Sequence, residues 1–576
     1  MAPSISTVES LLDSQLQSFY FLLAVAVMTR VGTGMACWIE KQSKFNGKEP
    51  PTVPYWIPVL GSLLTFLVNT DSFIMSSVKS FGPSTPFQVQ LAGMKISIVS
   101  GFKNTEAILK ASSRMTTTPG AIFALTRLLG TPKYIIPFYL ADDSGIGIDP
   151  RPGSRVEPQN RVIYHQQRNA HRFLSGSSLK EMNRRYLDTL QRNLLDLKIP
   201  DTWIELPDLY SFIQREVFRA SVEAMCGSYI LSLNPTFIED FWTWDANVPT
   251  LIRAYPRWLA PTAYRARDKM LGHVKRWHAF AKENSDWTKF GPNDPEWDPF
   301  WGSKLVKARQ TSCLETKVMD ADTIASEDLG LIFAGNTNAV PAIFWLFFHI
   351  LEDQKLQERV EQIIRSDDIL IPSEAEMLKL YDSPLLQSIY AETLRLRVGI
   401  AITRTPEQED FNLGAWRLRK GQLISLMSRT AALDKSVWST GNPENSHALD
   451  SFWAERFLRY PDDPKSGPLR EATGANTTTE SEKSTSGSNE PRYTTGGLSG
   501  AWIPYGGGKR MCPGRHFAKQ EILATLIVMC VLYDIELVSH DLKDLPKANL
   551  KYYPLGGLPP DRKLPVRIRR RTLGHK

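Results

Sequence analysis

The chain has few cysteines for its length. Five of its 576 residues are cysteine, and they are scattered without paired spacing: Cys37, Cys226, Cys313, Cys512 and Cys530. Disulfide scaffolds are dense in cysteine, whereas a sparse, odd set is typical of proteins in reducing compartments. We therefore expect free thiols and no disulfide framework.

A strong excess of one charge is also missing. Lysine and arginine number 68 against 61 acidic residues, for a net charge of +7, and the sequence pI is about 8.9. Because both signs are abundant, charge gives no indication of nucleic-acid binding. The hydrophobic share of 42%, with 15 tryptophans and 26 phenylalanines, is that of a globular protein with a large core.

Near the N-terminus, the apolar sequence is too short to span a bilayer unless one charge is included. The uninterrupted run Phe19–Met28 has ten residues, whereas a membrane-spanning helix needs about 20. A span over 19–39 is long enough if Arg30 extends its charge to the interface. Acidic residues, Glu9 and Asp13, precede the run, which argues against a cleaved signal peptide.

The residues after this run indicate its orientation. Lys41, Lys44 and Lys48 follow it, which places the rest of the chain on the cytosolic side. We expect an N-terminal segment, 1–48, with a single-pass anchor at about 19–39; the alternative is a helix lying in the membrane surface. Prolines in 49–62 predict a stiff extended hinge before the main domain, 63–576.

Periodicity predicts both strands and helices. Alternation predicts short strands within 87–99, and helical spacing predicts helices over 182–197, 209–225, 385–397 and 517–532. A longer helix is predicted over 326–353, with Ser326 as its N-cap. Because Pro341 cannot donate to the carbonyl of Thr337, we expect a distorted turn there. A kink of this kind also occurs in core helices without function.

The stretch Trp502–Glu521 has the most informative functional pattern. Three glycines precede Cys512, and a helix is predicted to start just after it. Glycine lets a flat ligand approach the backbone, and a helix N-terminus favours a thiolate. A structural thiol, a phosphate-binding loop and haem ligation with Arg510 beside a propionate all compete. The phosphate-binding loop fails, because it needs Ser or Thr after Lys509.

The spacing Tyr505-x-x-Gly508-x-Arg510-x-Cys512-x-Gly514 resembles the signature of the cytochrome P450 family, with Tyr505 where the family usually has Phe. The resemblance implies a mainly α fold with small β-sheets, preceded by a membrane anchor, with 63–576 as the haem-thiolate catalytic domain. It also implies haem b as cofactor, bound by Tyr505, Gly508 and Arg510, with Cys512 as axial ligand of the iron.

Two further motifs resemble those of the family, in the same order along the chain. Glu392 and Arg395 form an E-x-x-R motif about 120 residues before the cysteine. The segment Trp453–Phe457 is similar to the family's P-E-R-F, with Ala454 in place of Pro. The resemblance implies that Glu392, Arg395 and Arg456 form a buried triad. For E-x-x-R alone, the alternative is an exposed ion pair.

Other basic residues fit the resemblance less well. Family members usually offer a Trp and a basic residue to a haem propionate near 161–172, but no matching Trp is present. We interpret this basic run as a solvated helix face. Arg404 is a candidate second propionate partner, and an ordinary surface arginine is the alternative.

The centre of the long helix departs from the family pattern. Most family monooxygenases carry an acid followed by Thr there, to deliver protons to dioxygen, and these positions are Thr337 and Asn338 in this chain. They are the candidate catalytic residues. The local sequence resembles the branch that contains sterol 7α-hydroxylases and prostacyclin synthase.

That branch leaves the reaction open. The first hypothesis is hydroxylation of a hydrophobic small molecule, a terpenoid, meroterpenoid or steroid-like intermediate of specialised metabolism. The second is an isomerase or dehydratase that rearranges a peroxide without oxygen, and the third is a haem-binding protein without turnover. Segments 398–404 and 555–558 match substrate-contacting regions of the family and argue against the third.

The resemblance also implies partners and a location. Electrons would come from NADPH-cytochrome P450 reductase, with cytochrome b5 as a further partner, at the endoplasmic reticulum membrane with the catalytic domain in the cytosol. Lys509, Arg515 and Lys519 are expected to form a basic docking face. Segment 461–500 is low in complexity, and we expect a partly disordered surface insertion there.

Overall fold

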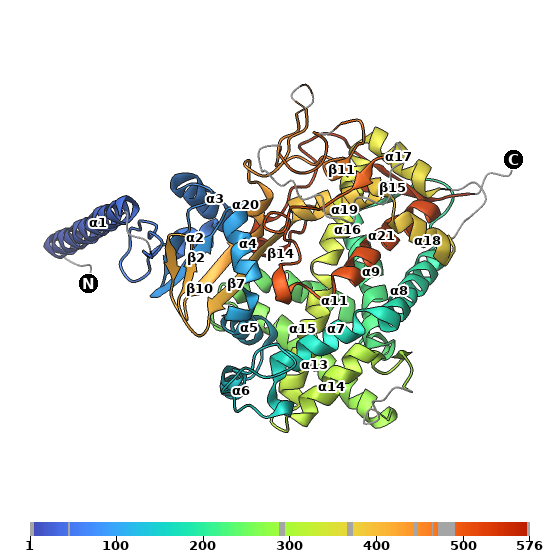
Figure 1. Cartoon of the computed structure of the whole chain (residues 1–576), viewed down its shortest axis with the longest axis horizontal. Helices are drawn as coiled ribbons and strands as arrows, with labels where there is room; N and C mark the ends of the chain where they lie inside the picture. Colours follow the sequence, from blue (N-terminus) through green and yellow to red (C-terminus); the bar gives the residue numbers. More distant parts are fainter. Residues whose placement is uncertain are drawn as a thin grey trace.

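Figure 1 shows one helix projecting from a body that has a sheet-bearing lobe beside that helix and a larger helical lobe beyond it. The computed structural model describes residues 5–43, 47–286, 294–365, 372–442, 444, 446–463, 465–470 and 490–572. Helices dominate these residues and the sheets are small, which confirms the predicted fold class.

The helices of the body, in chain order, are α2 (Leu63–Val68), α3 (Thr70–Phe81), α4 (Phe102–Lys110), α5 (Thr118–Ala124), α6 (Ile136–Ala141), α7 (Val162–Phe173), α8 (Gly176–Asp196), α9 (Leu209–Cys226), α10 (Tyr229–Ser232), α11 (Phe237–Asp245), α12 (Val248–Ile252), α13 (Pro261–Asn284), α14 (Lys304–Glu315), α15 (Ala321–Asn336), α16 (Ala339–Leu351), α17 (Gln354–Ile364), α18 (Glu374–Tyr381), α19 (Pro384–Arg397), α20 (Ser428–Ala432) and α21 (Arg515–Leu532).

The strands are β1 (Phe87–Leu91), β2 (Met94–Val99), β3 (Met115–Thr116), β4 (Ile204–Leu206), β5 (Trp297–Asp298), β6 (Gly302–Ser303), β7 (Val398–Pro406), β8 (Phe411–Leu413), β9 (Trp416–Leu418), β10 (Leu423–Met427), β11 (Leu458–Arg459), β12 (Arg492–Tyr493), β13 (Tyr533–Leu537), β14 (Leu555–Gly557) and β15 (Val566–Arg570).

The largest sheet joins strands from both ends of the chain. Its order is β1-β2-β10-β7-β14, and β3 also pairs with β7. Strands β1 and β2 form a hairpin in which Phe87 lies opposite Ile98, as the alternation within 87–99 predicts. Strand β14 pairs with β7, with Leu555 opposite Ile400. The two segments expected at a substrate pocket therefore lie side by side.

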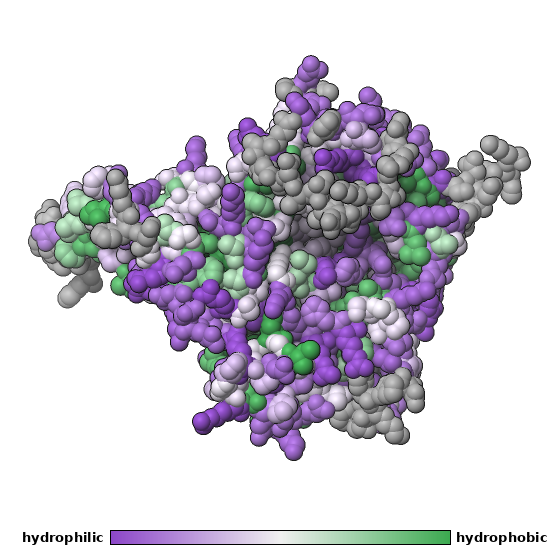
Figure 2. Space-filling view, in the orientation of Figure 1, coloured by the Kyte–Doolittle hydropathy of each residue, from purple (hydrophilic) through white to green (hydrophobic). Residues whose placement is uncertain are grey.

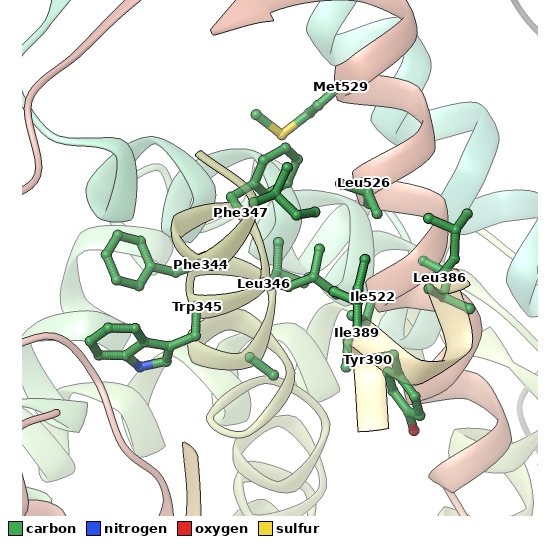
Figure 3. Close-up of a cluster of buried hydrophobic side chains, with 14 of the residues drawn as sticks. Phe344, Trp345, Leu346, Phe347, Leu386, Ile389, Tyr390, Ile522, Leu526 and Met529 are labelled. Carbon is green, nitrogen blue, oxygen red and sulfur yellow. The ribbon is translucent and has the colours of Figure 1, made fainter. Parts of the chain in front are cut away.

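Helix α16 is the centre of the core. All of its residues from Ala339 to Leu351 are buried, and a helix that is apolar all round belongs in a protein interior. Figure 3 shows Leu346 of α16 beside Ile389 of α19 and Ile522 of α21. Burying a side chain of this size stabilises the fold by about 1.5–3 kcal/mol. The core thus fixes α19 and α21, which carry motifs named above.

The predicted long helix is present, but its start and its middle differ from expectation. It begins at Ala321, because the Asp320 side chain caps it by accepting from the N–H of Thr323. Ser326 is therefore no cap; its buried hydroxyl lies 2.9 Å from that of Thr131. The helix breaks at Thr337 and Asn338 into α15 and α16, one turn before Pro341, as predicted.

The projecting helix is α1 (Ile5–Gln42), longer than the predicted anchor. Within the described residues, two helices are long and apolar enough to cross a membrane, Gln15–Gln42 and Ala321–Leu351. The second is 67% buried inside the body, whereas the first is 6% buried. Figure 2 shows hydrophobic side chains on the surface of the projecting helix. Among the helices of the described residues, α1 alone has the dimensions and exposure of an anchor.

The proline-rich hinge packs against α1 through Tyr55 and Trp56. The Arg30 guanidinium lies over the Trp56 ring, 5.7 Å from its centroid, and the Thr33 hydroxyl bonds to the backbone of Tyr55 at 3.2 Å. Arg30, the charge that interrupts the apolar run, therefore lies against an aromatic side chain of the hinge.

Half of the low-complexity segment 461–500, residue 464 and residues 471–489, lies outside the described residues, so the prediction of a partly disordered insertion is not tested there. Its C-terminal part includes β12, which pairs with β11 so that Tyr493 lies opposite Leu458. The insertion therefore leaves and re-enters the body close to the P-E-R-F-like segment.

Candidate functional site

The loop before α21 is shaped by glycine. Gly506 and Gly508 have φ values of 72° and 66°, and a Cβ on Gly508 would lie 2.0 Å from the carbonyl oxygen of Leu109. Gly508 to Arg510 form one 3-10 turn. The N–H of Cys512 then donates to the carbonyl of Tyr505 at 2.9 Å. Only glycine at 508 lets the loop lie this close to α4.

Cys512 lies at the end of this loop with an open face. The residue is solvent-accessible in the protein alone, although the surrounding protein raises the pKa of its thiol by burial. The N–H groups of Gly514 and Arg515 and the Arg515 charge lower that pKa, but less. The N–H groups at the helix N-terminus therefore favour a thiolate, as predicted, but burial outweighs them in the protein alone. A bound metal ion would supply the missing stabilisation, since it deprotonates a coordinating thiol.

Two arginines with unused donors lie near the same loop. Arg404 is 4% exposed; it donates to the carbonyls of Thr403 at 2.8 Å and Gly507 at 3.4 Å. Arg510 donates to the hydroxyl of Thr117 at 3.0 Å. The Nε of each arginine is buried without a partner among the described residues.

The charges of these arginines also favour a bound anion. Burial and, to a smaller extent, the nearby charge of Arg510 lower the pKa of Arg404 to about 10. Buried donors without acceptors are rare, and guanidinium groups bind carboxylates well. This donor set fits the two propionates of a haem whose iron is bound by Cys512. Arg404 is thus no surface arginine.

Tyr505 fastens the loop to α19. Its hydroxyl lies 2.6 Å from that of Tyr390, and the indole N–H of Trp502 donates to the carbonyl of Ala391 at 3.0 Å. A phenylalanine at 505 could not make the first of these bonds. The departure from the family's usual residue therefore has a structural partner, which sequence reasoning missed.

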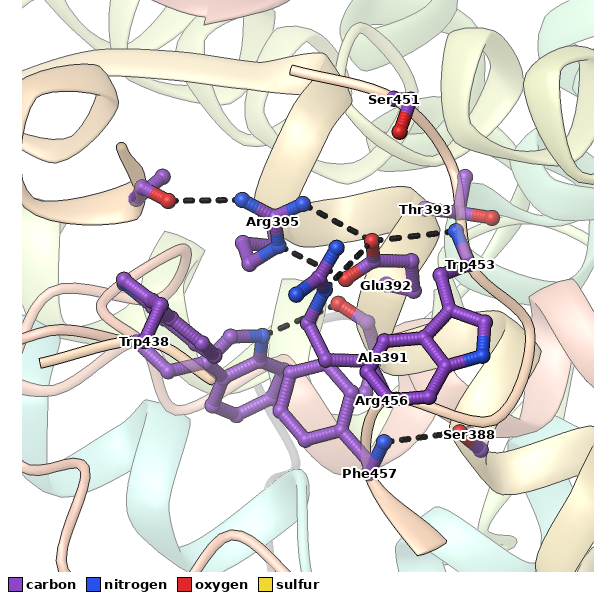
Figure 4. Close-up of polar contacts among 12 residues, drawn as sticks. Ser388, Ala391, Glu392, Thr393, Arg395, Trp438, Ser451, Trp453, Arg456 and Phe457 are labelled. Atoms are coloured by element: carbon purple, nitrogen blue, oxygen red, sulfur yellow. Dashed lines mark hydrogen bonds and ion pairs between the residues drawn. The ribbon is translucent and has the colours of Figure 1, made fainter. Parts of the chain in front are cut away.

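The triad residues meet behind the loop (Figure 4). Arg395 donates to both oxygens of Glu392, at 2.7 and 2.8 Å, and the Nε of Arg456 donates to the same carboxylate at 2.9 Å. All three side chains have 0% exposure. Burial raises the pKa of Glu392, but the two arginines hold it below its usual value.

Both arginines of the triad are satisfied further. Arg395 donates to the carbonyl of Ala432 at 2.6 Å, and Arg456 donates to the carbonyl of Ser439. A buried ion pair is stable only when such additional bonds are present. Because the partners come from separate segments, the triad joins α19, α20 and the segment before the insertion.

At the helix break, β14 is bonded to Asn338. The Oδ1 of Asn338 accepts from the N–H of Gly557 at 2.7 Å, and a Cβ on Gly556 would lie 2.3 Å from that oxygen. The Thr337 hydroxyl donates to the carbonyl of Phe333 at 2.9 Å. At the break, the Asn338 oxygen is therefore already hydrogen-bonded to Gly557, and the Thr337 hydroxyl proton is already hydrogen-bonded to Phe333.

The expected basic surfaces are confirmed in part. Lys509 is exposed, but Lys519 donates to Gln387 Oε1 at 2.7 Å and is half-buried. In the basic run 161–172, Arg161 is 5% exposed and donates to carbonyls of residues 147 and 148, so it is no part of a solvated face. Gln167, in the same helix, donates to the carbonyl of Lys509 at 2.7 Å.

Two residues that sequence reasoning missed lie at the helix break, Asp245 and Tyr552. They line one cavity together with Thr337 and Asn338. Asp245 lies 92 residues before Thr337 in the chain, and no local pattern marks it. Only the fold brings it there.

Comparison with known proteins agrees with this arrangement. A family model described as Cytochrome P450 matches residues 225–550. The chain is 36% identical to "Cytochrome P450 monooxygenase fsoE" of Humicola fuscoatra, over 96% of this chain and 90% of that one. It is 34% identical to "Cytochrome P450 monooxygenase efuG" of Hormonema carpetanum, over 96% and 97%.

More distant relatives agree with the branch indicated by the long helix. The chain is 24% identical to "Cytochrome P450 7A1" of Oryctolagus cuniculus, over 89% of this chain and 91% of that one. The structure titled "Retinoic acid bound cyanobacterial CYP120A1" has the same fold, with a TM-score of 0.60 at 17% identity, covering 92% of this chain and 100% of that one. The chain belongs to the cytochrome P450 family.

Proposed function

We propose that the protein is a haem-thiolate monooxygenase that hydroxylates a hydrophobic small molecule. The observation that carries the proposal is the donor set around the cysteine loop. Cys512 has an open face, and the Nε groups of Arg404 and Arg510 are buried without acceptors among the described residues. A metal ligand and two anion-binding groups in one site fit haem b.

Each residue of this site would then have a role. Cys512 would hold the haem iron, Arg404 and Arg510 would bind the propionates, Gly508 gives the loop its close approach to α4, and Tyr505 links the loop to α19. The bound haem supplies activation of dioxygen with two electrons from NADPH. The chain supplies binding, orientation and protons.

On the other side of the site, Thr337 and Asn338 are the proposed catalytic residues. Asn338 Oδ1 is occupied by Gly557, which orients the side chain. The Thr337 oxygen can accept a hydrogen bond, since its own proton is donated to Phe333. The Thr337 oxygen can therefore accept a hydrogen bond from a water or a substrate hydroxyl. Neither Thr337 nor Asn338 is an acid.

The proposed setting is the endoplasmic reticulum membrane. Helix α1 would be a single-pass anchor, within segment 1–48, and 49–62 would be the hinge to a cytosolic catalytic domain over 63–576. NADPH-cytochrome P450 reductase would supply electrons, and cytochrome b5 could supply the second. The exposed Lys509, beside the half-buried Arg515, is a basic contact for acidic partners.

The proposed substrate is a terpenoid, meroterpenoid or steroid-like intermediate of specialised metabolism. Two fungal relatives are named monooxygenases, and a 24% identical relative of Cricetulus griseus is named "Cholesterol 7-alpha-monooxygenase". Similarity to both supports a polycyclic hydrophobic substrate and an oxygen-dependent reaction.

A redox-neutral rearrangement of a peroxide is the second candidate. One observation favours it: Thr337 and Asn338 stand where most of the family has an acid and Thr, and neither is an acid. Such a reaction needs no proton delivery and no electrons.

The two candidates differ in their need for electrons. Membranes that contain the full chain and the reductase would be given the metabolite that accumulates when the gene is deleted from a producing strain. We expect hydroxylated product only when NADPH and reductase are both present. Product formed at an unchanged rate without either would overturn the monooxygenase and support the rearrangement.

A further inference from the structure

One cavity of the structure lies between α11, the helix break and β14. Its walls include Asp245 at the end of α11, Thr337 and Asn338 at the break, Gly556 of β14, and Tyr552 just before it. The cavity therefore brings Asp245 and the proposed catalytic residues to the walls of one space. It is also the place where segments far apart in the chain come together.

Asp245 is the only acid among the described residues that line this cavity. It is 8% exposed, and no ion pair to it is found in the described part of the chain. Carboxyl groups are seldom buried without a cation. The hydroxyl of Tyr552 donates to the Asp245 backbone carbonyl at 3.3 Å.

The surroundings keep this carboxyl able to exchange a proton near neutral pH. Burial, opposed by a smaller effect of Tyr552, raises the pKa of Asp245 to about 7. The other titratable group that Asp245 influences is Tyr210 of α9, whose pKa is raised far above its usual value, first by burial. Both phenols therefore stay neutral, and Asp245 alone changes charge in the cavity.

The wall of the cavity formed by the helix break has no acid to donate a proton. The segment Ala334–Asn338 contains no acid, and the Thr337 hydroxyl donates its proton within the helix. Asn338 accepts from β14 through its oxygen, which leaves the Nδ2 amide as its free donor. A water held by these two side chains would lie in the same cavity as the Asp245 carboxyl.

We propose that Asp245 is the acid that passes protons from solvent to the helix break, in place of the acid absent from the long helix. The proposal rests on the monooxygenase function proposed above. In the step itself, the O–H bond of the carboxyl breaks as its proton moves to a cavity water beside Thr337. The carboxylate then regains a proton from bulk solvent, and no electrons move.

The test compares Asp245→Asn with Glu239→Gln. Both changes remove a carboxyl from α11, but Glu239 is exposed and does not line the cavity. Full-length variants would be assayed in membranes with reductase, NADPH and the metabolite that accumulates in the deletion strain. Product and hydrogen peroxide would be measured per NADPH, and the carbon monoxide difference spectrum would report folded, haem-loaded protein.

We expect Asp245→Asn to keep its carbon monoxide spectrum and to form product roughly 10²-fold more slowly, the usual size of an acid's contribution. The electrons lost from product would appear as peroxide. Product formation by the wild type and by Glu239→Gln should fall as pH rises past about 7, the pKa of Asp245. That fall should be absent in Asp245→Asn, and Asp245→Glu should restore part of the rate.

Two results would overturn the proposal. One is an Asp245→Asn variant whose product, peroxide and pH profile match the wild type. The other is a change confined to KM, which would make Asp245 a substrate contact rather than a proton donor. In either case the wild type would still need NADPH and reductase for product, so the monooxygenase function would stand.

Discussion

The triad behind the cysteine loop and the cavity at the helix break each contain a buried carboxyl group, but only the carboxyl of the triad is paired with cations among the described residues. Glu392 accepts from Arg395 and Arg456, and all three side chains are fully buried. Asp245 is nearly as buried but has no cation partner among the described residues, and its pKa is raised to about 7. A paired carboxylate fixes structure and stays charged, whereas an unpaired one can exchange protons.

The difference separates a region that serves the cofactor shared by the family from a region that serves this protein's own reaction. In the proposed function the triad and the loop hold the cofactor, and that task is the same whatever the substrate. The cavity is formed by α11, the helix break and β14, elements that can vary without disturbing the triad. We expect changes in the first region to remove the haem-loaded protein, and changes in the second to alter turnover alone.

Breaking the triad should have the largest effect. Glu392→Gln removes the only carboxylate between two buried guanidinium groups, and removing one partner of a buried pair costs about 3–5 kcal/mol. We expect little folded protein with a carbon monoxide band. Glu374→Gln, in an exposed ion pair with Lys180, is the control and should lie within about 0.5 kcal/mol of wild type in thermal unfolding. A stable, haem-loaded Glu392→Gln would show that the triad is not needed to hold the loop.

Removing one propionate donor should have an intermediate effect. Arg510→Leu deletes a charged donor, and hydrogen bonds to charged groups contribute about 1.5–3 kcal/mol each. We expect faster loss of haem to an acceptor protein, with the thiolate-type carbon monoxide band retained. Arg168→Leu, an exposed arginine in α7, is the matched control. Equal rates of haem loss in both variants would argue against Arg510 as a propionate partner.

The residues of the proposed cofactor region could be named from the sequence because its motifs are local, and their roles stay predictions. One stretch of five residues contains Gly508, Arg510 and Cys512, and one turn of helix contains Glu392 and Arg395. The start of the long helix was wrong because Asp320, six residues before Ser326, caps it instead. Asp245 could not be predicted, since its importance depends on lying beside a helix break 92 residues later.

The smallest predicted effect concerns the hydroxyl pair that fastens the loop. Tyr505→Phe removes the partner of the Tyr390 hydroxyl, and a neutral hydrogen bond contributes about 1 kcal/mol net. We expect a slightly lower thermal midpoint and unchanged turnover. Because replacing both hydroxyls leaves none unpaired, the double change to Phe should cost less than the sum of the single changes. Additive losses would mean that the two hydroxyls do not interact.

The central claim is that Cys512 binds haem iron as a thiolate. The carbon monoxide difference spectrum of reduced membranes measures this directly, in the wild type and in Cys512→Ser. We predict a thiolate-type band in the wild type that is absent in Cys512→Ser, while Cys530→Ser, at a cysteine of α21, keeps it. A thiolate-type band that survives in Cys512→Ser would contradict the account.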